Sequence, residues 1–407
     1  MHLIFILIAN LLLTTAEQDL SEGTCDAAVK SCQNDPQNHD TKFLFYDVNP
    51  PEGFNLRRDV YMRFAVMMSE THKKGKKLDW RLVLPPWYRL YHWRSQRMIG
   101  QPLPWSTFFD VNSLKSFAPV VELNEILTNE TSNTLEIDTV YVLQNYDDPF
   151  EGGIFADKWQ VNKDNCRYDG DFWGHANVKA KEIVCVRFQG QISRLWELIS
   201  LHPSDKNVMF AHGEIALHDS YGTKNYWDCR KSMKFNENLV KTAEYYIENN
   251  LNCTEKLCKS YMAVHWRRQD FTRSRHNDVP SLHGTIDQID HAVRMHLRKI
   301  KKIFIASDAP TSELNLLIDE LEYLKYEVFH FTPSKTELEL FKDGGVAIID
   351  QIICSHAAYF IGTHESTFTF RIQEEREILG FDSDTTFNRL CPDSGVCEKP
   401  SRWTVIN

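Results

Sequence analysis

The amino-acid sequence predicts an α/β protein with two Rossmann-like domains that face each other across a cleft. Residues 42–84 read strand, loop, helix and strand, which is the order that opens a doubly wound α/β domain. Residues 261–377 alternate strand-like and helix-like segments, which indicates a second domain of the same kind. An apolar content of 42% supplies enough side chains for both cores and excludes a disordered chain.

The N-terminal segment indicates export. The apolar run at 3–13 is shorter than the ~20 residues that a membrane-spanning helix needs, and it ends at the small residues Thr14-Thr15-Ala16. We therefore expect a cleaved signal peptide at 1–16 and a polar leader at 17–41, with an uncleaved anchor as the alternative. The expected location is the lumen of the secretory pathway, without stable membrane insertion. A formal net charge of −10 excludes a general nucleic-acid binder, because phosphate binding needs a cationic face.

The first domain is expected at 42–250. Aromatic and β-branched residues predict a strand at 42–48, and the Pro and Gly content predicts a loop at 49–55. Apolar spacing predicts a helix at 56–69, and a strand at 81–84 stops at two prolines. Further on we expect strands at 140–143 and 207–210, a loop-rich stretch at 150–190, and a helix at 233–249.

The second domain is expected at 251–407, after a polar connection at 250–259. The alternation is clearer here than in the first domain. It predicts strands at 261–266, 302–307, 326–331 and 358–362, and helices within 282–300 and at 312–324, 346–354 and 366–377.

The cysteines suit an oxidising compartment, since all 10 follow the predicted signal peptide. Close pairs favour local disulfides, although spacing alone leaves the connectivity open. The candidate bridges are Cys25–Cys32, Cys166–Cys185, Cys253–Cys258 and Cys391–Cys397. Cys229 and Cys354 are left over, and Cys354 lies in an apolar run typical of a buried thiol. Sequons predict glycosylation of Asn129 and Asn252 on surface loops.

Three strand-to-loop junctions carry candidate site residues, because ligands of open α/β sheets bind beyond the carboxyl ends of the strands. The first junction is HWRRQD at 265–270. Its adjacent guanidinium groups, Arg267 and Arg268, suit a diphosphate, since arginine pairs its N–H fork with two oxygens. A surface ion-pair cluster with Asp270 explains this hexapeptide equally well.

The second junction is GTHESTF at 362–368. We expect Ser366 or Thr367 to cap the next helix, and free N–H groups and hydroxyls at a helix N-terminus form an anion site. An ordinary helix cap explains this segment on its own. The two junctions together favour phosphate binding, since both lie at strand ends of one predicted sheet.

The third junction is the turn NPPEGFN at 49–55, which carries Glu52 and Asn55. A carboxylate on a stiff Pro-Pro turn can act as a general base toward a hydroxyl group. A solvated loop glutamate is the alternative.

Several motifs are absent. The sequence lacks the nucleophile elbow, the zinc-protease helix motif, the P-loop and the dinucleotide fingerprint. Two Asp-x-Asp sequences, at 169–171 and 382–384, fall in polar loop stretches and not at strand ends, so we expect neither to bind a metal. The sequence therefore predicts a cationic site without a metal ion, in which arginine neutralises the diphosphate of a nucleotide sugar.

Six long stretches resemble the protein O-fucosyltransferases, in particular those that modify thrombospondin type 1 repeats. They are YDVNPPEGFNLRRDVY (46–61), LPPWYRLYHW (84–93), HWRRQDF (265–271), DVPSL (278–282), ELELFKDGGVAIIDQIICSHA (337–357) and TFTFRIQEEREILG (367–380). The resemblance implies a GT-B architecture that holds GDP-fucose between its two domains. It also implies inversion at the anomeric carbon, no metal or other cofactor, and residence in the endoplasmic reticulum.

The resemblance also implies roles for single residues. Glu52 corresponds to the catalytic base, and Arg267 to the group that stabilises charge on the departing β-phosphate. Asp350 corresponds to an acceptor for two guanine N–H groups. The resemblance and the three junctions together give further residues that are expected to contact the sugar-nucleotide donor. These are Pro51, Gly53, Phe54, Asn55, His265, Trp266, Ser366, Thr367 and Phe368. The side chain of Trp266 is expected to point away from the donor.

The expected partners are GDP-fucose and folded thrombospondin type 1 repeats. O-fucosylation of epidermal growth factor-like repeats is one alternative. The other is a non-catalytic chaperone or lectin that binds such repeats, although the presence of Glu52 together with Arg267 speaks against it.

Overall fold

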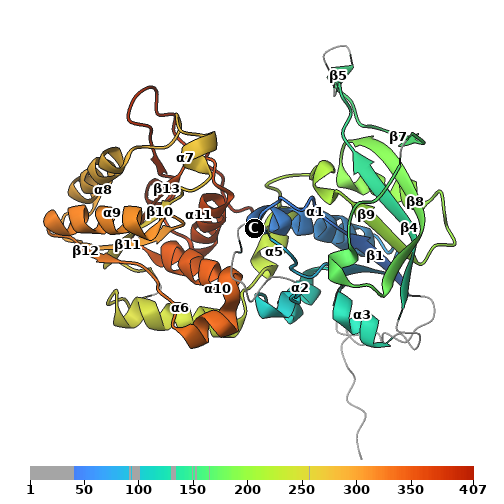
Figure 1. The fold of residues 1–407 in the computed structure, drawn as a ribbon, viewed down its shortest axis with the longest axis horizontal. Coiled ribbons are helices and arrows are strands. Elements are labelled where there is room, and N and C mark those ends of the chain that lie inside the picture. The colour runs from blue at the N-terminus through green and yellow to red at the C-terminus, as the bar shows by residue number, and fades with distance from the viewer. Residues whose placement is uncertain are drawn as a thin grey trace, which may run out of the picture. The chain divides into compact units, whose positions relative to one another are not determined.

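The computed structural model describes residues 41–90, 93, 101–129, 134–148, 150–151, 154–164, 166–255 and 257–407 (Figure 1). The predicted signal peptide, the leader and the Cys25–Cys32 bridge lie outside these residues. The segment Lys42–Asn407 belongs to one unit. Among the described residues, no helix has the length and apolar character that crossing a membrane requires.

A seven-stranded sheet occupies the first part of the chain, in the order β3-β2-β1-β9-β4-β8-β7. Its strands pair in parallel, except that β7 runs antiparallel to β8. The bounds are β1 Lys42–Tyr46, β2 Trp80–Leu84, β3 Val120–Glu122, β4 Leu135–Gln144, β7 Lys158–Asn162, β8 Val178–Gln189 and β9 Asn207–Ala211; β5 Phe150–Glu151 and β6 Ile154–Phe155 form a separate pair.

The long helix α1 (Phe54–Lys73) follows β1 and buries most of its length. Its apolar side chains pack with those of β1, β2 and β9 in the principal hydrophobic core. The other helices of this part are α2 Val111–Phe117, α3 Leu123–Asn129, α4 Leu195–Ile199 and α5 Lys224–Ser232, with short 3-10 turns η2 Trp105–Thr107, η3 Phe172–Gly174, η4 Ile192–Arg194 and η5 Gly213–Ile215.

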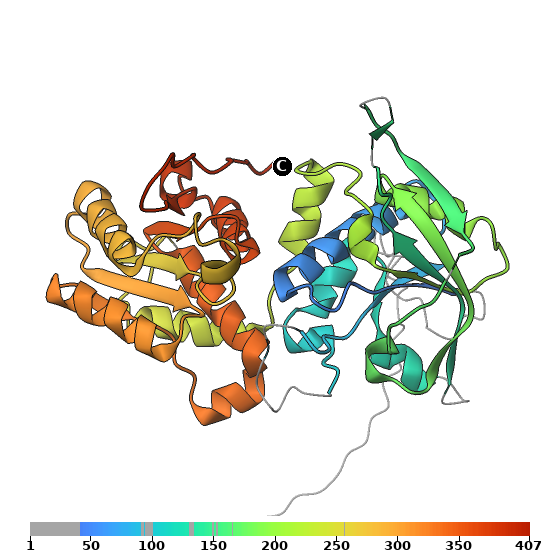
Figure 2. The same ribbon diagram turned by 45° about the horizontal axis from the view of Figure 1, so that its top comes forward.

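A five-stranded parallel sheet occupies the second part, in the order β12-β11-β10-β13-β14. Its central strands lie side by side in both views (Figure 1 and Figure 2). The strands are β10 Tyr261–Trp266, β11 Lys302–Ser307, β12 Glu327–Phe329, β13 Tyr359–Thr363 and β14 Arg389–Leu390. The helices are α6 Glu237–Asn249, α7 Phe271–Ser274, α8 Leu282–His296, α9 Thr311–Tyr323, α10 Lys335–His356, α11 Thr367–Leu379 and α12 Ser383–Thr386.

The alternation of side chains along β10 shows how this sheet is covered. Met262, Val264 and Trp266 pack in a core cluster with residues of α8 and α9. Tyr261 and Ala263 belong instead to the cluster that contains α10. Because successive side chains of a strand point to opposite faces, α8 and α9 cover one face of the sheet and α10 covers the other.

Two sequence predictions of secondary structure were wrong. The stretch predicted as loop-rich, 150–190, contains β7 and the long strand β8. The strand β8 exposes Lys and Glu over much of its length, because only part of its surface is buried, and this polarity hides the strand signal. Helix α6 begins at Glu237 and not at 233, because the Asn236 side chain caps it. Helix α10 starts at Lys335 behind a capping box at Ser334, and its backbone leaves the helical conformation at Lys342 (φ 58°, ψ −178°). The predicted helix at 346–354 lies within the segment after this kink, which ends at His356.

Candidate active site

The turn between β1 and α1 presents Glu52. The Glu52 N–H donates to the Asn49 carbonyl at 2.9 Å, and the Arg57 guanidinium donates to the carbonyls of Glu52 at 3.0 Å and Pro50 at 3.4 Å. Arg57 thus holds the turn through its backbone carbonyls, and among the described residues the Glu52 carboxylate has no direct ion pair. Burial and the nearby Glu214 raise the pKa of Glu52, and the charge of Arg57 only partly offsets them. A raised pKa makes this carboxylate a stronger proton acceptor.

The other residues of the turn have different environments. Pro51 is exposed, and Gly53 precedes α1 in an extended conformation. The ring of Phe54 is buried among aromatic side chains, with centroids 4.7 Å from Trp87 and 5.8 Å from Phe108. The structure therefore makes the Phe54 side chain part of the core.

Asn55 joins the first turn of α1 to α10. Its side-chain oxygen accepts hydrogen bonds from Gln351 Nε2 at 2.9 Å and from Arg58 Nη1 at 3.2 Å. The same Arg58 nitrogen donates to Gln351 Oε1 at 3.0 Å. Gln351 is the neighbour of Asp350 in the chain, so these bonds link the Glu52 turn to the helix that carries the predicted guanine acceptor.

The first two predicted junctions meet in the structure. Strands β10 and β13 are neighbours, with His265 opposite Gly362, and the Arg267 N–H donates to Thr363 Oγ1 at 2.9 Å. The Arg267 guanidinium lies 2.8 Å from Asp270 and 3.0 Å from Asp308. The predicted ion pair with Asp270 is therefore present, and Asp308, at the end of the adjacent strand β11, is a second partner.

Arg268 and Trp266 have structural roles. The Arg268 guanidinium donates to Glu313 at 2.8 Å and to the Pro280 carbonyl at 2.8 Å, and it lies 4.9 Å from the Trp266 ring centre. The Trp266 indole is 1% exposed and donates to Thr285 at 3.1 Å. Of the two adjacent arginines, Arg267 is the one placed beside β13.

His265 and the start of α11 form a buried layer next to Arg267. The His265 ring stacks on Phe368 at 4.4 Å, and its Nδ1 lies 2.7 Å from Thr369 Oγ1. Burial, together with the charge of Arg267, lowers the pKa of His265 to about 3, so the ring is neutral at pH 7. Gly362 makes this contact between β13 and α11 possible, because a Cβ there would lie 2.6 Å from Thr369.

The N-terminus of α11 lacks a side-chain cap. Ser366 occupies the N-cap position as predicted, but its side chain makes no capping hydrogen bond, and Thr367 is exposed. The first N–H groups of this 13-residue helix are consequently not satisfied by a cap, which is the arrangement that binds anions.

Asp350 is a buried carboxyl on α10. Burial raises its pKa well above the usual range, and its Oδ1 has no hydrogen-bond partner among the described residues. A buried acceptor without a partner is unfavourable, and the N–H groups of a ligand would satisfy it.

Charged side chains connect α1 with α11 and α5. Asp59 of α1 lies 3.3 Å from Arg371 of α11, and Arg371 lies 2.9 Å from Glu374. Glu374 also accepts from Arg230 and Tyr226 of α5, at 2.9 and 2.5 Å. These contacts place the helix that follows Glu52 against the helix that follows the Gly362 junction.

The sequence reasoning missed several of these residues. Asp308 follows β11, Thr363 ends β13, Thr369 lies in α11, and His212 and Glu214 follow β9. All except Thr369 stand at strand-to-loop junctions, but their residue types alone do not mark them as site residues there.

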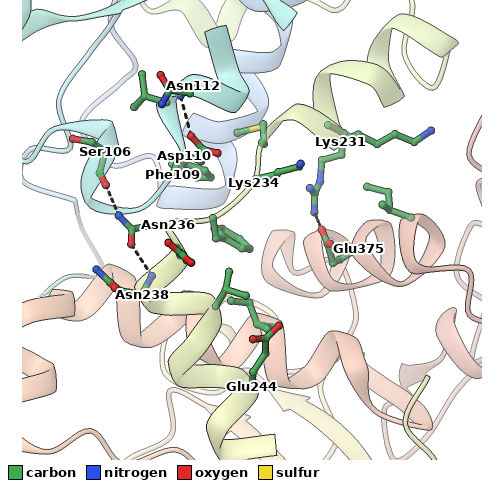
Figure 3. Close-up of a pocket in the computed structure, with 18 of the residues that line it drawn as sticks. Ser106, Phe109, Asp110, Asn112, Lys231, Lys234, Asn236, Asn238, Glu244 and Glu375 are labelled. Carbon is green, nitrogen blue, oxygen red and sulfur yellow. Dashed lines mark hydrogen bonds and ion pairs between the residues drawn. The ribbon is translucent and has the colours of Figure 1, made fainter. Parts of the chain in front are cut away.

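A separate pocket of about 860 Å³ is shown in Figure 3. It is lined by residues of η2, α2, α5, α6, α10 and α11, among them Glu244, and by residues between these elements, among them Phe109, Lys234 and Asn236. The lining includes no predicted site residue. The pocket is thus distinct from the strand ends described above.

The disulfide predictions are confirmed where the structure describes them, at Cys166–Cys185, Cys253–Cys258 and Cys391–Cys397. Cys229 and Cys354 are free and buried, and the burial of Cys354 was expected from its apolar run. Asn252 is exposed, in agreement with its predicted surface position, whereas the side chain of Asn129 lies outside the described residues. Over the described part of the chain, no group of three or more His, Cys, Asp or Glu side chains is arranged to hold a metal ion.

Comparison with known proteins places this chain in a family. Residues 43–379 match the model of the family described as GDP-fucose protein O-fucosyltransferase. The chain is 41% identical over 397 residues to GDP-fucose protein O-fucosyltransferase 2 of Homo sapiens, covering 89% of this chain and 90% of the relative. It is 37% identical to the protein of the same name in Caenorhabditis elegans, with 90% of each chain covered.

Solved structures agree with the α/β, GT-B-like fold. POFUT1 in complex with GDP superposes with a TM-score of 0.57 at 18% identity, covering 86% of this chain and 98% of that chain. POFUT1 in complex with GDP-fucose gives a TM-score of 0.57 at 17% identity, covering 87% and 99%. The predicted fold class is thereby confirmed. From the family match over most of its length and the identity to these relatives, the chain belongs to the GDP-fucose protein O-fucosyltransferase family.

Proposed function

We propose that this protein transfers fucose from GDP-fucose to Ser or Thr hydroxyls of folded thrombospondin type 1 repeats in the endoplasmic reticulum, with inversion and without a metal ion. Family membership supports the coarser part, the transfer of fucose from GDP-fucose to proteins. The observation that carries the mechanism is the Glu52 turn, where a carboxylate with a raised pKa lies just before helix α1, which contacts α10 and α11.

The proposed reaction is a single displacement. The acceptor hydroxyl oxygen attacks C1 of fucose on the face opposite the diphosphate and gives its proton to Glu52. The bond between C1 and the phosphate oxygen breaks, and its electron pair leaves with GDP. GDP leaves as a stable anion, so one carboxylate serves the reaction and no general acid is required.

The donor's diphosphate is proposed to bind at the ends of β10 and β13. Arg267 is oriented there by Asp270 and Asp308, and the uncapped N-terminus of α11 supplies N–H groups. Both stabilise the negative charge that grows on the β-phosphate. Asp350, whose Oδ1 is buried without a partner among the described residues, is proposed to accept from guanine N–H groups.

The proposed compartment agrees with the three disulfides, because such bonds persist in oxidising surroundings. The acceptor class rests on the stretches of sequence that resemble enzymes acting on thrombospondin repeats.

The test of this function is a competition assay. Purified protein is incubated with GDP-fucose, a folded thrombospondin repeat and a folded epidermal growth factor-like repeat, with reduced repeats and a parallel reaction in EDTA as controls. We expect the mass of one fucose to appear on the folded thrombospondin repeat alone, with or without EDTA. Transfer to the epidermal growth factor-like repeat would assign O-fucosylation of that repeat instead. GDP-fucose binding without any transfer would favour the non-catalytic chaperone or lectin.

A further inference from the structure

His212 and Glu214, which follow the end of β9, lie next to the Glu52 turn. Strands β1 and β9 pair in parallel, with Tyr46 opposite Phe210, so the segments that follow them meet at one edge of the sheet. Backbone hydrogen bonds continue past the strands, from Asp47 N to the Phe210 carbonyl at 2.9 Å and from Gly213 N to the Asp47 carbonyl at 2.8 Å. The loop 212–214 is therefore held beside the turn 47–53.

The Glu214 side chain holds the beginning of the turn. Its Oε2 accepts from the Asn49 N–H at 3.2 Å, and Asn49 in turn accepts from the Glu52 N–H. The Glu214 backbone carbonyl accepts from Arg63 of α1 at 2.9 Å. One residue thus contacts both the turn that carries Glu52 and the helix that follows it.

His212 pairs with the same carboxylate in an uncommon backbone conformation. Its Nδ1 lies 3.4 Å from Glu214 Oε1, and its φ of 58° and ψ of 44° are left-handed. The next residue is glycine because a Cβ at Gly213 would lie 2.8 Å from the ring of Phe64. Left-handed backbone in residues other than glycine is concentrated at functional sites.

The charges around Glu52 and His212 affect the pKa values of both side chains. Glu52 is influenced by the like charge of Glu214 and the opposite charge of Arg57. The hydrogen bond with Glu214 raises the pKa of His212, partly offset by burial, and Asp47 and Asp169 add smaller effects in the same direction as the bond. The imidazole beside Glu214 therefore takes up its proton at a higher pH than an ordinary histidine, because its pKa is raised.

We infer that His212 and Glu214 are positioning residues for Glu52: Glu214 fixes the turn and keeps the base strong, while His212 moderates the charge of Glu214. The inference rests on the proposed function, in which Glu52 accepts the proton of the acceptor hydroxyl. Neither residue contacts the reacting atoms in this scheme.

The test compares the pH profiles of kcat for Glu214→Gln and His212→Asn. Asparagine tolerates left-handed backbone, so His212→Asn removes the imidazole without refolding the loop. We expect the acid limb of Glu214→Gln to shift to lower pH, because the like charge beside Glu52 is gone. The acid limb of His212→Asn should shift to higher pH, because Glu214 then acts without its counter-charge. A purely structural role moves neither limb.

A third variant tests the contact with the turn. In Glu214→Ala we expect kcat to fall about 10- to 100-fold, since a displacement of ~1 Å at a reacting group can cost about 100-fold. The affinity for GDP should change by less than about 2-fold, since GDP lacks the reacting sugar. Glu182→Gln, on the exposed side of β8, is the matched control and should behave as wild type.

The outcomes separate the two proposals. An inactive wild-type protein contradicts the proposed function. An active wild type with an inactive Glu52→Gln variant, but with unshifted acid limbs in both His212→Asn and Glu214→Gln, overturns this inference alone. Shifts in the same direction in both variants overturn it as well.

Discussion

At the turn between β1 and α1, the Glu52 carboxylate is partly buried and has the like charge of Glu214 nearby. Both effects raise its pKa above the value of ~4.3 that is usual for glutamate. The charged form is the base, so kcat should be constant at higher pH and fall as the pH drops through the raised pKa. Measuring kcat from about pH 4 to about pH 9 should place the acid limb above the usual glutamate value. A limb at or below that value would contradict the assignment.

Asp350 is the second single residue with a clear prediction. Asp350 is proposed to accept from two guanine N–H groups, and an asparagine amide has only one acceptor oxygen, so Asp350→Asn should weaken GDP binding about 10-fold. Because the variant removes a buried carboxyl with a raised pKa, its thermal stability should be equal or higher. Calorimetric titration with GDP measures the affinity, and Asp343→Asn on the same helix is the control. Unchanged affinity in Asp350→Asn would remove this residue from the donor site.

At the scale of elements, the approach of α11 to β13 decides where the uncapped helix N-terminus lies. In Gly362→Ala the new methyl group would meet Thr369 at 2.6 Å, so the start of α11 has to move. We expect the KM for GDP-fucose to rise about 10-fold, because donor groups must be held within a fraction of an ångström. Steady-state kinetics measure this.

A second substitution tests the cause of that loss. Gly362→Ala combined with Thr369→Ala removes both the Thr369 methyl carbon and Oγ1, each of which would lie 2.6 Å from the new Cβ, and it should recover part of the affinity although the contact of Oγ1 with His265 is lost. A KM equal to that of wild type in Gly362→Ala would show that the close approach is unimportant for donor binding.

Sequence patterns predicted elements well where burial is strong. The strands β10, β11 and β13 are almost entirely buried and read as apolar runs, so their bounds agree within a residue or two. By contrast, β8 has an exposed face and β7 is a partly exposed edge strand, and their polar residues resemble a loop. The candidate site followed the same rule: junctions after well-predicted strands were found, whereas His212 and Glu214 were missed because nothing in the local pattern distinguishes them from an ordinary turn.

Tertiary contacts were beyond prediction from local patterns. The hydrogen bonds of Gln351 with Asn55 and Arg58 join positions almost 300 residues apart. Arg58 is fully buried, and its Nε and Nη2 have no hydrogen-bond partner among the described residues. Composition and periodicity place such an arginine on a surface, since charged residues are seldom buried.

At the scale of the whole molecule, the buried ion-pair network around Glu374 ties α11 to α1 and α5. Glu374 is 0% exposed and balances Arg371 and Arg230. Glu374→Gln removes the negative charge that balances these two guanidinium groups. Breaking a buried ion pair in this way lowers the free energy of unfolding by about 3–5 kcal/mol. Denaturant unfolding should show this loss. Glu375→Gln, which affects only a partly exposed partner of Arg230, should lose much less, and equal losses would argue against the network.

The central claim is that Glu52 takes the acceptor's proton and is not needed to hold the donor's nucleotide. The most direct measurement pairs GDP binding with fucose transfer in wild type and Glu52→Gln. We expect equal GDP affinity, and transfer to a folded thrombospondin repeat that is slower by about 100- to 10,000-fold, the usual contribution of a general base. Transfer by Glu52→Gln at a rate within a few-fold of wild type would contradict the account.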